Sequence, residues 1–185
     1  MPGDVVDLIM QDHREVERLF DQLESNPDKR PNLLPVLTTL LTAHSRAEEA
    51  EVYPVARDEA GETEQVAHSQ EEHLLADQLL AKLAGTDPAT PTFDKVLSEL
   101  VEAVTHHVQE EETKVLPGIR ARISEQRRTD LGEAFLASRA QHLGEQPGEA
   151  TKQDLVQQAR NINLPGAAAM SKDDLERELK KQADE

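Results

Sequence analysis

The chain of 185 residues has room for one medium-sized domain with a small appendage. Its 20 Lys and Arg residues against 37 Asp and Glu residues give a formal net charge of −17, which repels phosphate backbones and anionic membranes. The absence of cysteine excludes disulfides, thiolate nucleophiles, Cys-based zinc fingers and iron–sulfur clusters. Neither a secretory signal nor a membrane-spanning stretch is recognisable, so we expect a cytoplasmic protein without a membrane partner.

Apolar residues recur at intervals of three and four along four long segments, which predicts four amphipathic helices. Proline and glycine separate these segments, and no segment alternates polar and apolar residues as a strand would. Short connections between long helices favour antiparallel neighbours. We therefore expect an all-α, up-down-up-down four-helix bundle. Its predicted helices span residues 4–24, 32–58, 62–84 and 92–116.

The C-terminal part of the chain is predicted to hold an extra helix and a small helical module. An amphipathic stretch at 124–142 is expected to pack outside the bundle. Thr151 and Ser171 each precede an acidic residue by three positions, the arrangement of a loose capping box, and predict helices at 151–160 and 171–182. The predicted units are a bundle at 1–142, a linker at 143–150 and a two-helix module at 151–185.

The bundle sequence contains an internal repeat. A shift of 63 residues places the second predicted helix on the fourth, and a shift of 60 places the first on the third. The bundle is therefore two copies of one helical hairpin, each with a lone histidine followed by His-x-x-x-Glu, related by an approximate two-fold axis. The polar positions match in pairs: His13 with His73, His44 with His107, and Glu48 with Glu111.

These six side chains fall on the apolar seams of the helices, which predicts that they face the bundle interior. A spacing of four, as between His44 and Glu48, places both side chains on one helix face. Burying unpaired carboxylates costs on the order of several kcal/mol each. Because no Lys or Arg shares these seams, we expect metal ions to supply the compensating positive charge.

The ligand types favour iron over zinc. Paired sites of two His and one carboxylate with open positions suit non-haem iron, whereas structural zinc is usually closed at four ligands. Two six-coordinate irons offer about twelve positions; four His, two bridging Glu and an oxo or hydroxo bridge fill about ten. At least one position then stays open even if Tyr53 is a ligand. The expected cofactor is two iron ions with an oxo or hydroxo bridge.

The pattern resembles the signature of the hemerythrin-like HHE cation-binding family, over about residues 4–117. The resemblance implies a non-haem di-iron centre that handles O₂, peroxide or nitric oxide. Oxygen-carrying hemerythrins have a second histidine four residues after the third-helix one, where this chain has Asp77, and this departure counts against reversible O₂ carriage. The matching residues are His13, His44-x-x-x-Glu48, His73 and His107-x-x-x-Glu111.

Tyr53, the only tyrosine, precedes Pro54 at a position where some bacterial relatives supply a phenolate ligand to iron. On an ideal helix its side chain lies about 140° from that of Glu48, so Pro54 would have to distort the turn for it to reach the metal. Its repeat partner is Leu116, which favours a packing role. Ligation and packing are therefore alternatives for Tyr53.

Other polar residues near the motif are assigned to the surface. His106 lies off the seam and His142 lies beyond the bundle, so both are expected to be exposed. His68 would need a bulge to face the interior and is a secondary candidate as an outer or alternative ligand. Glu49 and Glu112 follow the predicted ligand carboxylates directly and are expected to be solvated.

Two functions of different classes fit these features. One is an enzyme that turns over a small neutral oxidant, peroxide or nitric oxide, at the open iron position. The alternative is a sensor or binding protein for O₂, NO or iron that signals through residues 151–185. That segment resembles helix-extended-helix modules of the SAP and Rho N-terminal type, which often contact nucleic acid. Its six basic and seven acidic residues give little attraction for phosphate, which favours a protein partner.

Overall fold

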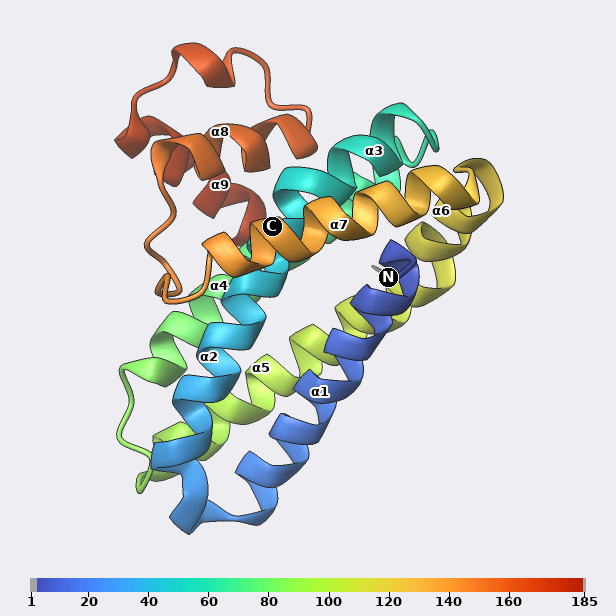
Figure 1. Cartoon of the computed structure of the whole chain (residues 1–185). Coiled ribbons are helices and arrows are strands. Elements are labelled where there is room, and N and C mark those ends of the chain that lie inside the picture. The colour runs from blue at the N-terminus through green and yellow to red at the C-terminus, as the bar shows by residue number, and fades with distance from the viewer. Residues whose placement is uncertain (1–2, 185) are drawn as a thin grey trace.

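The computed structural model describes residues 3–184, and within that range every regular element is a helix (Figure 1). Four long helices pack side by side in chain order, and the last returns beside the first, which confirms the predicted up-down-up-down bundle. None of the helices in the described range is long and apolar enough to cross a membrane. The bundle helices are α1 (Val5–Ser25), α2 (Arg30–Ala47), α4 (Thr63–Ala84) and α5 (Pro91–Glu110).

Each helix that carries His-x-x-x-Glu changes to one π-helical turn at the glutamate. A proline lies two residues beyond the end of each π turn, Pro54 in the first case and Pro117 in the second. Proline has no N–H and its ring clashes with the carbonyl four residues back, so the backbone before it cannot keep α-helical bonding. The π turns are η2 (Glu48–Val52) and η3 (Glu111–Val115), followed by α3 (Tyr53–Asp58) and α6 (Leu116–Arg122).

The predicted end of the fourth helix at residue 116 is wrong, because the chain remains helical to Arg122. Pro117 occupies the second position of α6, which continues directly from the π turn η3. The other predicted outer ends of the bundle helices lie within two residues of the observed ones. Proline therefore marks a change in the hydrogen-bonding pattern of the helix here rather than the end of the helix.

Two apolar clusters fill the bundle and leave a polar layer between them. In α1, Ile9 belongs to one cluster and Val16 to the other, with His13 at the boundary. Full burial of one large aliphatic side chain stabilises the fold by about 1.5–3 kcal/mol. The clusters thus hold the four helices rigidly on both sides of the polar layer. Their largest fully buried members include Leu19, Leu23, Leu37, Leu80, Leu100, Leu116 and Phe135.

The extra helix α7 (Glu125–Gln141) crosses the outside of the bundle along α1, α2 and η2, as predicted for residues 124–142 (Figure 1). The hydroxyl of Ser124 accepts a hydrogen bond from the backbone N–H of Arg127 and caps its first turn. Phe135 from this helix is fully buried, and its ring lies 5.8 Å from that of His44. Helix α7 therefore closes one side of the polar layer.

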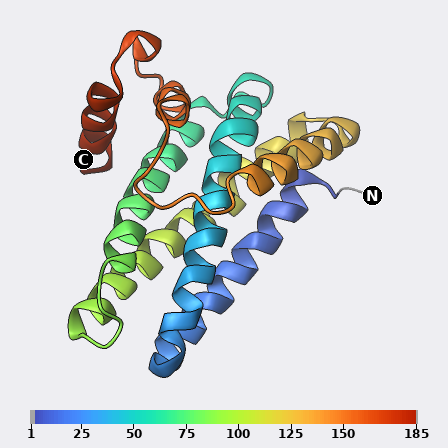
Figure 2. The same cartoon turned by 60° about the vertical axis from the view of Figure 1, so that its left-hand side comes forward.

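The C-terminal segment forms α8 (Lys152–Asn161), a 3₁₀ turn η4 (Ala167–Ala169) and α9 (Lys172–Asp184). Both predicted caps are present, because the side chains of Thr151 and Ser171 accept from the backbone N–H groups three residues on. The two helices pack on each other and beside α4, as both views show (Figure 2). Helix α8 also packs against η2. The division into bundle, linker and module remains a prediction.

Candidate metal centre

Four helices each direct one imidazole into the polar layer, and the two π turns each add a carboxylate. The imidazoles are at most 6% exposed, and both carboxylates are fully buried. The six residues that the sequence predicts as ligands therefore lie together, although their role as ligands remains a prediction. They are His13 on α1, His44 on α2, His73 on α4, His107 on α5, Glu48 at the start of η2 and Glu111 at the start of η3.

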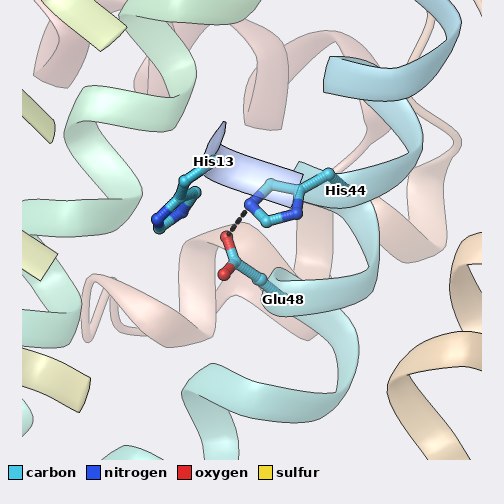
Figure 3. A group of neighbouring side chains, drawn as sticks. All are labelled: His13, His44 and Glu48. Atoms are coloured by element: carbon cyan, nitrogen blue, oxygen red, sulfur yellow. Dashed lines mark ion pairs between the residues drawn. The ribbon is translucent and has the colours of Figure 1, made fainter. Parts of the chain in front are cut away.

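Glu48 stands between the two hairpins of the repeat. Its Oε2 atom lies 3.2 Å from His44 Nε2 and 3.4 Å from His73 Nε2. Figure 3 shows His13, His44 and Glu48 directed toward one another, and their ligand atoms lie within 4.8 Å of each other. Glu48 forms a second group of this kind with His73 and His107. One carboxylate thus belongs to two candidate metal-binding groups.

Glu111 occupies the symmetry-related place. Its Oε2 atom lies 3.2 Å from His13 Nε2 and 3.7 Å from His107 Nε2. Each carboxylate therefore reaches one imidazole from the first hairpin and one from the second. The Nε2 atoms of His73 and His107 lie 3.0 Å apart, a spacing that fits two donors on one ion. This arrangement suits carboxylates that bridge two neighbouring cations.

The carboxylates lack hydrogen-bond partners. Both oxygens of Glu48 and of Glu111, together with His13 Nε2, are buried without a hydrogen bond to any described residue. The nearby buried cation, Arg46, contacts Glu49 instead, at 3.1 Å. Each carboxylate that is buried without a partner destabilises the fold by roughly several kcal/mol. The buried oxygen and nitrogen donors therefore fit metal ions at this position.

A second carboxylate holds the outer nitrogen of every imidazole. Such a contact keeps the proton on Nδ1, fixes the ring orientation and directs the Nε2 lone pair inward, which is the usual arrangement around metal-binding histidines. The Nδ1–carboxylate distances are 2.9 Å for His13 with Glu112, 3.1 Å for His44 with Asp12, 3.2 Å for His73 with Glu49, and 2.9 Å for His107 with Glu72.

The expectation that Glu49 and Glu112 are solvated is wrong. Glu49 is 3% exposed because α8 covers η2, and the Glu112 side chain is 20% exposed because it turns toward His13. A sequence signal for these residues did exist. The shift of 63 pairs Glu49 with Glu112, and the shift of 60 pairs Asp12 with Glu72. The outer carboxylates therefore obey the same two-fold repeat as the inner residues.

The electrostatic field of the site favours positive charge. Burial disfavours a charged imidazole, but Glu48 and Asp12 outweigh this effect and raise the pKa of His44 to about 10. Glu48 and Glu49 likewise outweigh burial and raise the pKa of His73 to about 9. Without a metal, protons compensate the carboxylates. Metal ions must replace these protons, so binding releases protons to solvent.

The π turn brings Tyr53 to the centre. The Tyr53 backbone N–H donates to the Glu48 carbonyl, the five-residue bond of a π helix, and both side chains thereby share one face. Tyr53 is fully buried, and its hydroxyl lies 3.0 Å from His73 Nε2. The distortion that ligation requires is therefore present. Leu116 occupies the equivalent position in the other repeat and packs in an apolar cluster.

The remaining candidates lie away from the centre. His106 is exposed, as expected, and His142 is partly exposed outside the bundle. No bulge turns His68 inward; its side chain is 52% exposed. Asp77, at the position of the histidine of oxygen carriers, contacts Arg46 at 3.3 Å rather than any of the central imidazoles. Asp77 is therefore no substitute for the missing ligand.

The sequence matches the family described as Hemerythrin HHE cation binding domain over residues 4–119. The chain belongs to this family. It is 29% identical over 151 residues to a DNA nickase of Nostoc sp., a match that covers 80% of this chain and 42% of that protein. It is 27% identical over 135 residues to an uncharacterized hemerythrin-like protein of Schizosaccharomyces pombe, covering 71% of this chain and 66% of that protein. No solved structure matches the chain.

Substitution of the inner residues tests the metal centre. We expect His107→Ala and Glu111→Ala each to bind fewer iron ions per chain than the unaltered protein. Because the free energy of metal binding is also folding free energy, the rise in Tm on iron loading should shrink in both variants. Elemental analysis and paired melting curves of apo and loaded protein measure these effects. His142→Ala, which removes an imidazole outside the bundle, is the control. Unchanged iron content in both variants would contradict the assignment.

The role of Tyr53 is tested by Tyr53→Phe, which removes the hydroxyl and keeps the ring. If Tyr53 binds iron, the ferric protein has a phenolate-to-iron charge-transfer band in the visible region that the variant lacks. Iron content measured in parallel separates a lost band from lost metal. A spectrum without this band in the unaltered ferric protein would assign Tyr53 to packing alone.

Proposed function

We propose that the centre holds two iron ions and reacts with small neutral oxidants: hydrogen peroxide, nitric oxide or O₂. Two features support a pair of ions: Glu48 belongs to both candidate groups, and Glu111 reaches an imidazole of each. The donors are nitrogen and oxygen without thiolate, a set that suits iron. Bound iron would supply electron transfer and an open coordination position.

A small cavity at the candidate metal centre supports this choice of substrate. It has a volume of about 10 Å³, close to the smallest space that one water molecule occupies. The four imidazoles line it together with aliphatic side chains. Such a space excludes a larger organic substrate and favours the smallest ligands, such as a diatomic gas or a peroxide molecule. The aliphatic lining consists of Val16, Leu41, Ala76, Val104 and Val108.

The surroundings also select against anions. Residues 1–150 carry a charge of −16 out of the total −17, so the field of the bundle repels negatively charged molecules. The apolar lining offers an approaching ion no replacement for its water shell. The outer carboxylates meanwhile keep each imidazole in one orientation, so the positions of the inner donors persist when a ligand enters.

This proposal predicts selectivity by size. Iron-loaded protein should change its absorption spectrum on addition of hydrogen peroxide or NO, whereas a bulky alkyl hydroperoxide should react far more slowly. Val104→Phe places a ring in the cavity and should slow the reaction with hydrogen peroxide by on the order of tenfold. This corresponds to a rise of ~1.4 kcal/mol in the activation free energy. Val36→Phe is the matched control, because Val36 is 50% exposed.

Iron content and Tm of both variants are measured alongside the rates. A loaded protein whose spectrum does not respond to peroxide, NO or O₂ would contradict the proposal. Such a result would favour a coordinatively saturated or zinc-filled structural site.

A second candidate function, sensing through the C-terminal helices, is favoured by the contacts of Glu49. Its Oε1 lies 3.2 Å from His73 Nδ1, and its Oε2 accepts from Gln158 Nε2 of α8 at 3.0 Å. Asn161 Nδ2 donates to the Glu49 carbonyl, also at 3.0 Å. All four residues are buried. One carboxylate therefore touches an inner imidazole and the C-terminal segment, so a movement of His73 would reach α8.

Sensing predicts that iron changes the protection of residues 151–184 from hydrogen exchange. Gln158→Leu should weaken this change, whereas Gln153→Leu, at an exposed position of the same helix, should preserve it. Equal exchange with and without iron would contradict signalling through this segment.

A chain truncated at Gly144 should still bind iron, because no proposed ligand lies beyond Glu111. Loss of iron on truncation would make the segment part of the metal site.

We do not propose DNA nicking for this chain. The relative of that name is matched over 42% of its length, so the residues responsible for its activity can lie outside the match. The charge of −17 gives the present chain little attraction for a phosphate backbone. Residues 151–185 are nearly neutral, with six basic and seven acidic side chains, and a protein partner suits them better.

A further inference from the structure

Helices α4 and α5 carry a second pair of His-x-x-x-Glu sequences on their outer surface. One consists of His68 and Glu72 on α4, and the other of His106 and Glu110 on α5. A spacing of four places each pair on one helix face. The two helices pack against each other, so the pairs meet across their interface. On α5 this outer pair precedes the inner pair by one residue, which turns it about 100° away from the bundle interior.

The distances within this outer cluster match those between neighbouring ligands of a metal ion. His68 Nε2 lies 3.2 Å from Glu110 Oε2 and 3.5 Å from Glu72 Oε1. These three atoms all lie within 4.8 Å of one another. Donors bound tetrahedrally at about 2.0–2.1 Å are roughly 3.3–3.4 Å apart. A further imidazole, that of His106, lies beside this three-residue group: its Nδ1 atom is 2.7 Å from the same Glu72 oxygen.

We propose that His68, Glu72, His106 and Glu110 form a surface site for a divalent transition-metal cation. Two imidazoles and two carboxylates are a donor set that binds Zn²⁺ and related ions. The imidazoles are 52% and 61% exposed, so a cation reaches them directly from solvent. This site uses none of the six inner residues of the buried centre.

The charged neighbours leave the donor atoms available. Lys114 Nζ contacts the other oxygen of Glu110, Oε1, at 2.5 Å, and leaves Oε2 directed at His68. Glu71 Oε2 lies 3.8 Å from His68 Nδ1 on the side away from the cluster donors. The second oxygen of Glu72 lies 2.9 Å from Nδ1 of the inner His107. A single carboxylate therefore joins the surface site to the buried centre.

The test is titration of iron-loaded protein with Zn²⁺, followed by isothermal calorimetry, with the iron content of each sample measured before and after. The variants are His68→Ala and His106→Ala, because both side chains are exposed and their removal should leave the fold intact. Glu72 is unsuitable as a test residue because it also contacts His107. The control is His142→Ala, which removes an imidazole that contacts Glu145 outside the cluster.

We expect the unaltered protein and the control to bind one Zn²⁺ per chain at this site while keeping their iron. Affinity should fall by at least about tenfold in each cluster variant, equivalent to ~1.4 kcal/mol. Binding of equal strength in both cluster variants, or no binding in the unaltered protein, would overturn the proposal. Release of iron in proportion to added Zn²⁺ would also overturn it, because the zinc would then occupy the buried centre. The result does not depend on whether the iron reacts with oxidants.

Discussion

Two carboxylates, Glu48 and Glu111, lie fully buried in the middle of the bundle without a hydrogen bond to any described residue. The rest of the structure depends on what neutralises them. The apolar clusters above and below exclude water, so only a charge brought into the layer can compensate. In the metal-free protein the imidazoles supply that charge as protons, and membership of the HHE cation-binding family identifies metal ions as their replacement.

The internal repeat explains how one chain places two symmetry-related sets of metal-binding side chains around one centre. Each hairpin supplies two imidazoles and one inner carboxylate, and each inner carboxylate reaches across to the other hairpin. The outer carboxylates follow the same symmetry, so both halves orient their histidines in the same manner. The symmetry is broken at two places: Tyr53 in the first repeat is replaced by Leu116 in the second, and α8 covers Glu49 but not Glu112. These differences give the two candidate metal-binding groups unequal surroundings.

Hydrophobic periodicity and the repeat were sufficient to predict the bundle and to place the six inner residues together, because seam positions depend only on spacing along a helix. Three features were beyond this reasoning. The π turn η2 turns the Tyr53 side chain toward the centre, and Pro54 was the sequence signal for this distortion. The burial of Glu49 depends on α8, which is more than 100 residues away in sequence. The pairing of His68 with Glu110 likewise depends on how α4 and α5 are aligned. Tertiary contacts decide the burial of Glu49 and the pairing of His68, whereas the π turns follow from the prolines beyond them.

In the proposed centre, Glu48 and Glu111 would each contact both of two iron ions. A crystal structure of iron-loaded protein, with anomalous data collected at the iron absorption edge, measures this directly. We expect two anomalous peaks inside the bundle, each bound by the Nε2 atoms of two imidazoles and both in contact with Glu48 and Glu111. A single peak, or iron confined to the surface with the inner carboxylates unbound, would contradict it.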